Sequence, residues 1–261
     1  YVPSYMGGAK ALSYAAKMSN LKILQMLNAG YDDALAYLRP GLTLCNARGV
    51  HDASTAELAV GLAIASRRGF AEFIREQGAG TWNHRRFPAL SDSKVGIIGF
   101  GSIGKEVARK LSGFDVSITA FTHSGRDGTV KIDDLDKHLP QLDIVILILP
   151  LTDSSRHMFN AQRLAAMKDG ALIVNVARGP IIDTEALLKE LNSRRIHAAL
   201  DVTDPEPLPQ GHPLWSAPNL IVVPHVGGNS EAFEPRGRAL IESQLKLLAA
   251  GLPIAHVVAQ G

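Results

Sequence analysis

Short hydrophobic runs recur along the chain from residue 93 onward, each followed by a polar or glycine-rich turn and then by a helical pattern. The runs are apolar at nearly every position instead of alternating, which is typical of strands that are covered on both faces. They occupy residues 94–99, 116–121, 143–149, 171–176, 197–202 and 220–223. Strands that alternate with helices in this way predict an α/β fold with a doubly wound, Rossmann-type parallel sheet of six strands.

The remaining segments carry helical patterns and one further strand. Residues 8–18 are expected to be helical, residues 21–26 to form a strand and residues 28–31 to form the turn after it. Ser54 and Glu57 have the spacing of a capping box, which predicts that a helix begins there and continues to Gln77. Residues 78–88 have the composition of a loop, and residues 231–250 are expected to form a long C-terminal helix.

These elements predict two domains. A complete α/β domain is expected over residues 51–228, and a second, smaller α/β domain over residues 1–50 and 229–261. The first αβ segment is too small to be a domain by itself and is followed by a complete one. We therefore expect the start of the second domain to be missing from the chain.

Composition narrows the class of protein. The 261 residues are 46% hydrophobic and 20% charged, which describes a soluble globular chain and excludes disorder and fibres. The net charge is +2 and the basic residues are scattered, so no nucleic-acid surface is expected. The longest apolar run, residues 144–151, is far shorter than the ~20 residues of a membrane helix. Cys45 cannot form an intramolecular disulfide, and no secretion signal opens the chain, so a cytoplasmic location is expected.

A glycine motif follows the first of the six runs. Gly99, Gly101 and Gly104 have the GxGxxG spacing, and the helical pattern of residues 105–111 comes directly after them. In a dinucleotide-binding fold the first glycine allows a tight turn, the second lets the backbone approach the pyrophosphate, and the third allows helix and strand to pack closely. Because the strand and the helix are both in place, the motif predicts dinucleotide binding.

Four polar residues follow the later strands. Arg178, Asp201, Glu206 and His225 come at or just after the ends of predicted strands, and open α/β sheets bind ligands at that edge. For each residue alone, an ordinary structural role such as a surface ion pair or a turn carboxylate is the favoured interpretation. Together they offer an arginine that can hold an anion and a His-Glu pair that can move a proton.

Five segments give the chain a specific resemblance: GVHDASTAEL, VGIIGFGSIG, NVARGPIIDTEAL, ALDVTDPEPLP and VVPHVGG, in this order. The chain resembles the D-isomer-specific 2-hydroxyacid dehydrogenase family, in particular its glyoxylate/hydroxypyruvate reductases. The resemblance implies that Arg178, Glu206 and His225 are catalytic. It also implies that the backbone amides at Ala29 and Gly30 bind the substrate carboxylate.

The reaction that the resemblance implies is reduction of a 2-oxo acid to a 2-hydroxy acid by a nicotinamide cofactor. His225 would deliver a proton to the carbonyl oxygen, and Glu206 would raise the pKa of His225. Arg178 would hold the carboxylate and polarise the carbonyl. Asp201 would face the nicotinamide carboxamide. No metal is expected, because the chain lacks the HExxH spacing and similar ligand patterns.

Other functions known from the same superfamily remain open alternatives. Some members of the superfamily act as dinucleotide-sensing corepressors, and they can retain the same three catalytic residues. Phosphoglycerate dehydrogenase is a further alternative, whereas formate dehydrogenase is disfavoured because its pattern has glutamine at the position of Glu206. The resemblance also places the helix after Ser54 in a two-fold dimer interface, so a homodimer is expected.

The end of the second strand run predicts the cofactor. An NAD-binding fold has an acidic residue there, about 20 positions beyond the glycine motif, but this chain has Thr122. Hydroxyl groups and the positive charge of Arg126 favour a 2′-phosphate, so NADP is expected and NAD is the less favoured alternative. The predicted cofactor-binding residues are Gly99, Gly101, Ser102, Ile103, Gly104, Thr122, His123, Ser124, Arg126 and Asp201.

Overall fold

The computed structural model describes residues 1–261, which form two compact units. One unit contains Tyr1–Ser54 and Gly228–Gly261, and the other contains Thr55–Gly227. Helix α2 (Asp52–Arg67) carries the chain from the smaller unit into the larger one, and the chain returns at Gly228. No helix in the structure combines the length and the apolar character needed to cross a membrane.

The larger unit is built on a sheet of seven parallel strands in the order β5-β4-β3-β6-β7-β8-β9. The strands are β3 (Lys94–Ile98), β4 (Ser117–Thr122), β5 (Val130–Lys131), β6 (Ile144–Leu147), β7 (Leu172–Asn175), β8 (His197–Leu200) and β9 (Leu220–Val222). This topology confirms the predicted doubly wound fold, and each predicted run coincides with one strand, β4 ending one residue beyond its run. Strand β5 was not predicted, because two residues at the sheet edge are too short for a recognisable run.

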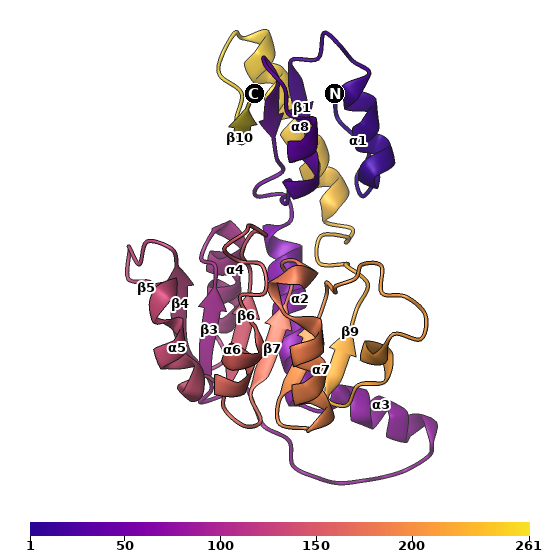
Figure 1. The fold of residues 1–261 in the computed structure, drawn as a ribbon, viewed down its shortest axis with the longest axis vertical. Coiled ribbons are helices and arrows are strands. Elements are labelled where there is room, and N and C mark those ends of the chain that lie inside the picture. Colours follow the sequence, from indigo (N-terminus) through magenta and orange to yellow (C-terminus); the bar gives the residue numbers. More distant parts are fainter. The chain divides into compact units, whose positions relative to one another are not determined.

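Helices cover both faces of this sheet (Figure 1). Helices α2 and α4 (Ser102–Leu111) pack on one face, and α5 (Leu135–His138), α6 (Ala161–Ala166) and α7 (Thr184–Asn192) pack on the other. Successive residues of a strand point to opposite faces, so Ile97 packs with α2 and α4 while Ile98 packs with α5 and α6. Both faces of each central strand are therefore buried, which explains the continuous apolar runs. Short 3₁₀ turns lie at Ile132–Asp134, Leu139–Gln141, Gly179–Ile181 and Pro213–Ser216.

The predicted helix from Ser54 to Gln77 is wrong at both its start and its middle. Helix α2 begins at Asp52, and the Ser54 hydroxyl donates to the carbonyl of His51, so Ser54 and Glu57 do not form a capping box. The helix ends at Arg67, and a separate helix α3 (Phe70–Gly78) follows. Gly69 separates them with φ +66°, a left-handed conformation that interrupts a right-handed helix.

The smaller unit has a three-stranded sheet in the order β1-β2-β10. Strands β1 (Ile23–Gln25) and β2 (Thr43–Cys45) are parallel, and β10 (Val257–Gln260) pairs antiparallel with β2. Helices α1 (Gly8–Ala16) and α8 (Phe233–Ala249) lie within the predicted ranges, and a 3₁₀ helix, η1, spans Asp32–Tyr37. Strands β2 and β10 were not predicted. The sheet needs a strand from each end of the chain, so residues 1–50 do not complete it alone.

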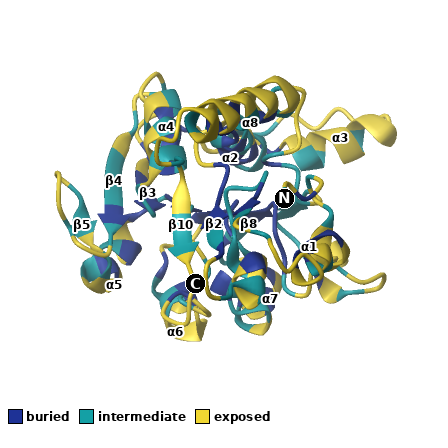
Figure 2. Ribbon diagram, turned by 90° about the horizontal axis from the view of Figure 1, so that it is seen from above, coloured by how far each residue is buried: buried dark blue, intermediate teal, exposed yellow.

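The buried residues lie mainly in the strands and on the helix sides that pack against them (Figure 2). The central strands of the larger unit are buried, whereas the outer sides of its helices are exposed. In the smaller unit, Leu12 of α1 packs with Leu24 of β1 and Leu44 of β2 in a separate core. Gln244 of α8 joins the two ends of the chain there, because its amide donates to Gln25 Oε1 at 2.7 Å and to the carbonyl of Ala255 at 2.7 Å.

Candidate active site

The carboxyl ends of the seven strands form the edge at which the predicted site residues of the larger unit gather. The chain continues outward in opposite directions from the neighbouring strands β3 and β6, which makes this point the topological switch of the sheet. Ligands of doubly wound folds bind outside such a switch point. The glycine motif begins directly after β3, so it lies at this position.

The glycine loop fits a dinucleotide. Gly99 has φ +98°, and a Cβ there would lie 2.2 Å from the carbonyl oxygen of Ile148. A Cβ on Gly104 would lie 2.3 Å from the carbonyl oxygen of Gly99, so α4 can pack this closely only with glycine at that position. A Cβ on Gly101 would meet no atom within 4 Å, which leaves the loop open on that side. No side chain caps α4, so its first amides remain available for phosphate oxygens.

His225 and Glu206 form a direct pair. The Nδ1 atom of His225 lies 2.5 Å from Oε1 of Glu206, and both side chains are partly exposed, at 31% and 38%. Burial is the largest single influence and raises the pKa of Glu206, but the hydrogen bond with His225, the charges of His225 and Arg178 and a backbone hydrogen bond from Thr203 together hold that pKa below its ordinary value. An ionised carboxylate only accepts hydrogen bonds, so Nδ1 carries a hydrogen and donates it. The other ring nitrogen, Nε2, makes no hydrogen bond within the chain and can act on a substrate.

Asp201 holds the segment that contains His225. The amide of His225 donates to the Asp201 carbonyl at 2.7 Å. The Asp201 carboxylate accepts hydrogen bonds from the amides of Val226 at 2.6 Å and Gly227 at 3.0 Å. These contacts fix His225 in a left-handed conformation with φ +52°. Burial of the Asp201 side chain raises its pKa despite both hydrogen bonds.

Arg178 follows strand β7 and is held by Asn175, a residue that the sequence analysis did not single out. The Asn175 amide donates to the Arg178 carbonyl at 2.9 Å, and its oxygen accepts from the amide of Ala177 at 3.0 Å. A Cβ on Gly179 would lie 1.9 Å from the carbonyl oxygen of Thr203, so the Arg178 loop packs tightly against the loop that leads to Glu206. The charge of Arg178 makes a small contribution to the lowered pKa of Glu206.

The loop after β4 contains the residues expected to choose the cofactor. The Thr122 hydroxyl is engaged within the loop, where it accepts from the Gly125 amide at 3.0 Å and lies 2.7 Å from Oγ1 of Thr129. The exposed side chains of His123, Ser124 and Arg126 make no hydrogen bond within the chain. Ser124 and Arg126 are therefore available to a ligand, whereas the Thr122 hydroxyl is already bonded.

Ala29 and Gly30 belong to the smaller unit. The Asn46 side chain donates to the Ala29 carbonyl at 2.8 Å and fixes this turn. The backbone amides of Ala29 and Gly30 donate to no acceptor within the chain. Two successive unbonded amides are an arrangement that binds anions.

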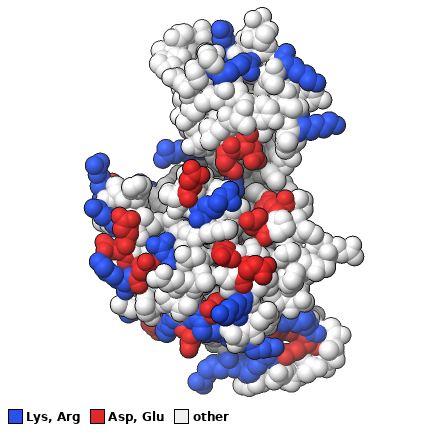
Figure 3. All heavy atoms as spheres, viewed as in Figure 1, with Lys and Arg blue, Asp and Glu red and all other residues white.

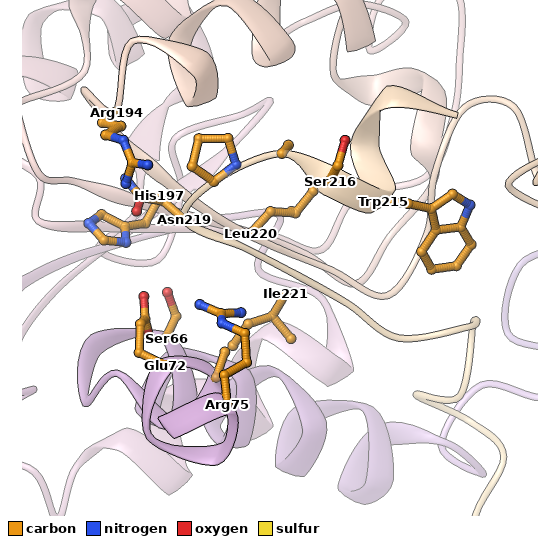
Figure 4. A pocket seen from close by; sticks show the side chains of 13 residues that line it. Ser66, Glu72, Arg75, Arg194, His197, Trp215, Ser216, Asn219, Leu220 and Ile221 are labelled. Carbon is orange, nitrogen blue, oxygen red and sulfur yellow. The ribbon is translucent and has the colours of Figure 1, made fainter. Parts of the chain in front are cut away.

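We identify no second site among the charged side chains and cavities elsewhere in the structure. On the face drawn in Figure 3, Lys and Arg side chains alternate with Asp and Glu side chains. No group of three or more His, Cys, Asp or Glu side chains is arranged to hold a metal ion. A cavity of about 430 Å³ lies at the opposite edge of the sheet, where β8 and β9 begin (Figure 4). It is lined by Glu72, Arg75, Arg194 and His197 among others, and by no predicted site residue.

Comparisons with known proteins agree with this arrangement. Residues 60–227 match the family model described as D-isomer specific 2-hydroxyacid dehydrogenase, NAD binding domain. A glyoxylate reductase of Thermofilum pendens is 36% identical over 84% of this chain and 68% of its own length. A hydroxypyruvate reductase of Thermotoga maritima is 36% identical over 88% of this chain and 78% of its own length.

A solved structure is similar over most of the chain. It is an NADPH-dependent glyoxylate/hydroxypyruvate reductase of Sinorhizobium meliloti, in complex with NADP and sulfate. The two chains have a TM-score of 0.82 and 27% identity, over 94% of this chain and 81% of the other. With the family match, the glycine loop and the fold all in agreement, the chain belongs to the D-isomer specific 2-hydroxyacid dehydrogenase family and is an oxidoreductase that uses a nicotinamide cofactor.

Proposed function

We propose that the chain reduces a small 2-oxo acid to a D-2-hydroxy acid with NADPH, with His225, Glu206 and Arg178 as its catalytic residues. The observation that carries this proposal is the 2.5 Å contact between His225 Nδ1 and Glu206 Oε1, beside Arg178 and at the same sheet edge as the glycine loop. Relatives that reduce glyoxylate and hydroxypyruvate support the substrate class.

In this mechanism a reduced nicotinamide supplies the hydride for the carbonyl carbon. His225 donates a proton from Nε2 to the carbonyl oxygen, while Glu206 accepts the hydrogen bond from Nδ1 and fixes the orientation of the ring. Arg178 binds the carboxylate and stabilises the negative charge that develops on the carbonyl oxygen. Asp201 keeps His225 in position through the backbone and is also our candidate for the contact with the nicotinamide carboxamide.

The free amides of Ala29 and Gly30 are our candidates for a second contact with the substrate carboxylate. Their lack of acceptors within the chain supports this role.

The experiment that tests the proposed function is a panel of 2-oxo acids with NADPH and with NADH. We expect oxidation of the cofactor with glyoxylate, hydroxypyruvate or pyruvate. Tight cofactor binding without turnover across the panel would contradict an enzyme and favour a dinucleotide sensor. The panel also decides which 2-oxo acid is preferred.

The change Thr122→Asp should lower kcat/KM for NADPH on the order of tenfold or more, because a carboxylate near the 2′-phosphate repels it. NADH has no 2′-phosphate, so its kcat/KM should stay the same or rise. The Asp side chain can still accept the amide of Gly125 and preserve the turn. Steady-state kinetics with both cofactors measure the effect. An unchanged ratio of the two values would argue against NADP recognition by this loop.

We also propose that the chain forms a homodimer. Helix α3 directly follows α2 and has no buried residue, and it exposes Phe70, Phe73 and Ile74. Trp82 lies just beyond it and is 96% exposed. Apolar side chains gathered in this way are typical of an association surface, and a two-fold dimer covers such a patch with its own copy.

Sedimentation velocity at micromolar concentration should therefore give the mass of two chains. The variant Ile74→Glu introduces a charge at a side chain that is 66% exposed, so it should shift the mass towards one chain without affecting folding. A wild-type protein that sediments as a single chain would refute the dimer.

A further inference from the structure

Two hydroxyl groups and two backbone groups form a hydrogen-bond network in the loop between β4 and β5. Thr122 Oγ1 lies 2.7 Å from Thr129 Oγ1, and Thr129 Oγ1 lies 2.6 Å from the carbonyl oxygen of Arg126. The amide of Gly125 donates to Thr122 Oγ1 at 3.0 Å. The backbone pairs Phe121 with Val130 and Thr122 with Lys131, so the network closes a short loop whose two ends are held in the sheet.

The direction of each hydrogen bond follows from the chemistry of the groups. A carbonyl oxygen only accepts, so the single hydroxyl hydrogen of Thr129 goes to Arg126. Thr122 must then donate its own hydroxyl hydrogen to Thr129, and it accepts from Gly125. Both hydroxyl hydrogens are used within the loop. Thr122 therefore has no hydrogen left for a phosphate, in contrast to the role that its position in the sequence suggested.

The network instead fixes the backbone that carries the free polar groups. The Arg126 carbonyl accepts twice from Thr129, once from the hydroxyl and once from the amide at 3.1 Å. Gly125 has φ +64°, and a Cβ there would lie 2.6 Å from Cγ of Lys131, so the turn is also confined from the β5 side. Ser124 and Arg126 lie within the stretch held between these fixed points, and their side chains make no hydrogen bond within the chain.

We propose that Thr129 is a positioning residue for 2′-phosphate recognition: through Thr122 and the Arg126 carbonyl it holds Ser124 and Arg126 ready to bind that phosphate. This inference rests on the proposed use of NADP. Thr129 itself does not touch the ligand. Its hydroxyl selects for the phosphate by limiting the conformations of the loop before binding, which reduces the entropy lost on binding.

The test is calorimetric binding of two probes, 2′,5′-ADP and 5′-AMP, which differ by the 2′-phosphate alone. Thr129→Val keeps the shape of the side chain but removes the hydroxyl. It should weaken 2′,5′-ADP binding about three- to tenfold, the effect of losing one or two hydrogen bonds. Binding of 5′-AMP should not change. Thr129→Ser should restore wild-type binding, and Thr119→Val, which removes an unbonded hydroxyl from β4, should have no effect.

A double-substitution cycle separates positioning from a general structural effect. If Thr129 acts through Arg126, Thr129→Val should weaken 2′,5′-ADP binding much less in an Arg126→Ala background than in the wild type. The positioning role would be overturned if Thr129→Val weakened 2′,5′-ADP binding by the same factor in both backgrounds. It would also be overturned if this variant weakened the binding of both probes equally. A Thr129→Val variant that binds 2′,5′-ADP as the wild type does would overturn it as well. If the wild-type protein bound the two probes equally, the proposed use of NADP would be refuted. The positioning role of Thr129 depends on that use and would be refuted as well.

Discussion

Replacing His225 by asparagine should lower kcat by about 10²–10⁴-fold, because the substitution removes the general acid that protonates the carbonyl oxygen. Asparagine tolerates left-handed backbone, so the φ of +52° at this position is retained. Nδ1 of His225 is engaged by Glu206, so Nε2 is the ring nitrogen that can reach a substrate. Steady-state kinetics with the preferred 2-oxo acid measure the loss.

A matched control is available elsewhere in the same unit. His157 also has a left-handed backbone, with φ +49°, and its exposed ring makes no hydrogen bond. His157→Asn should leave kcat unchanged. Cofactor binding should be similar in both variants and in the wild type. Near-native turnover by His225→Asn would show that the proton comes from another group.

Replacing Arg178 by alanine should lower kcat/KM for the 2-oxo acid by roughly 30- to 4000-fold. This range corresponds to the loss of about 2–5 kcal/mol when one member of a charged, hydrogen-bonded pair is truncated. Much of the effect should appear as a higher KM, because Arg178 binds the carboxylate in the ground state as well as stabilising charge in the transition state. Cofactor binding should change little.

The control for this change is Arg156→Ala. Arg156 is exposed and its guanidinium makes no hydrogen bond or ion pair, so its removal should leave both parameters unchanged. The Arg178 variant should also fold normally, because Asn175 still holds the loop when the 2.8 Å hydrogen bond from Arg178 Nη1 to the Ala177 carbonyl is lost. A KM equal to that of the wild type would exclude Arg178 as the carboxylate-binding residue.

The parallel sheet was predictable because both faces of its central strands are buried. Ile97 and Ile98 pack into opposite cores, and such residues leave continuous apolar runs that are visible in the sequence. Short edge strands leave no such run: β5 has two residues, and β10 depends on pairing with β2 at the other end of the chain. The break at Gly69 was missed because the helical pattern continues on both sides of it.

The candidate catalytic residues were also accessible from the sequence, since Arg178, Glu206 and His225 all follow strands whose carboxyl ends share one edge. The contacts that hold these residues were not accessible. Asn175 was not singled out, and Asp201 was expected to face the cofactor, whereas it also binds the backbone amides of Val226 and Gly227. Thr129 acts through a second hydroxyl. Asn, Asp and Thr are common in turns for many reasons, so only the coordinates distinguish these roles.

The most direct test of the account is to follow the hydrogen that is transferred. The protein is incubated with a 2-oxo acid and NADPH that carries deuterium at both C4 positions of the dihydronicotinamide ring. The account predicts one D-2-hydroxy acid, with deuterium at carbon 2, for each NADPH oxidised. Bound cofactor with no hydroxy acid formed, or a product without deuterium at carbon 2, would contradict it.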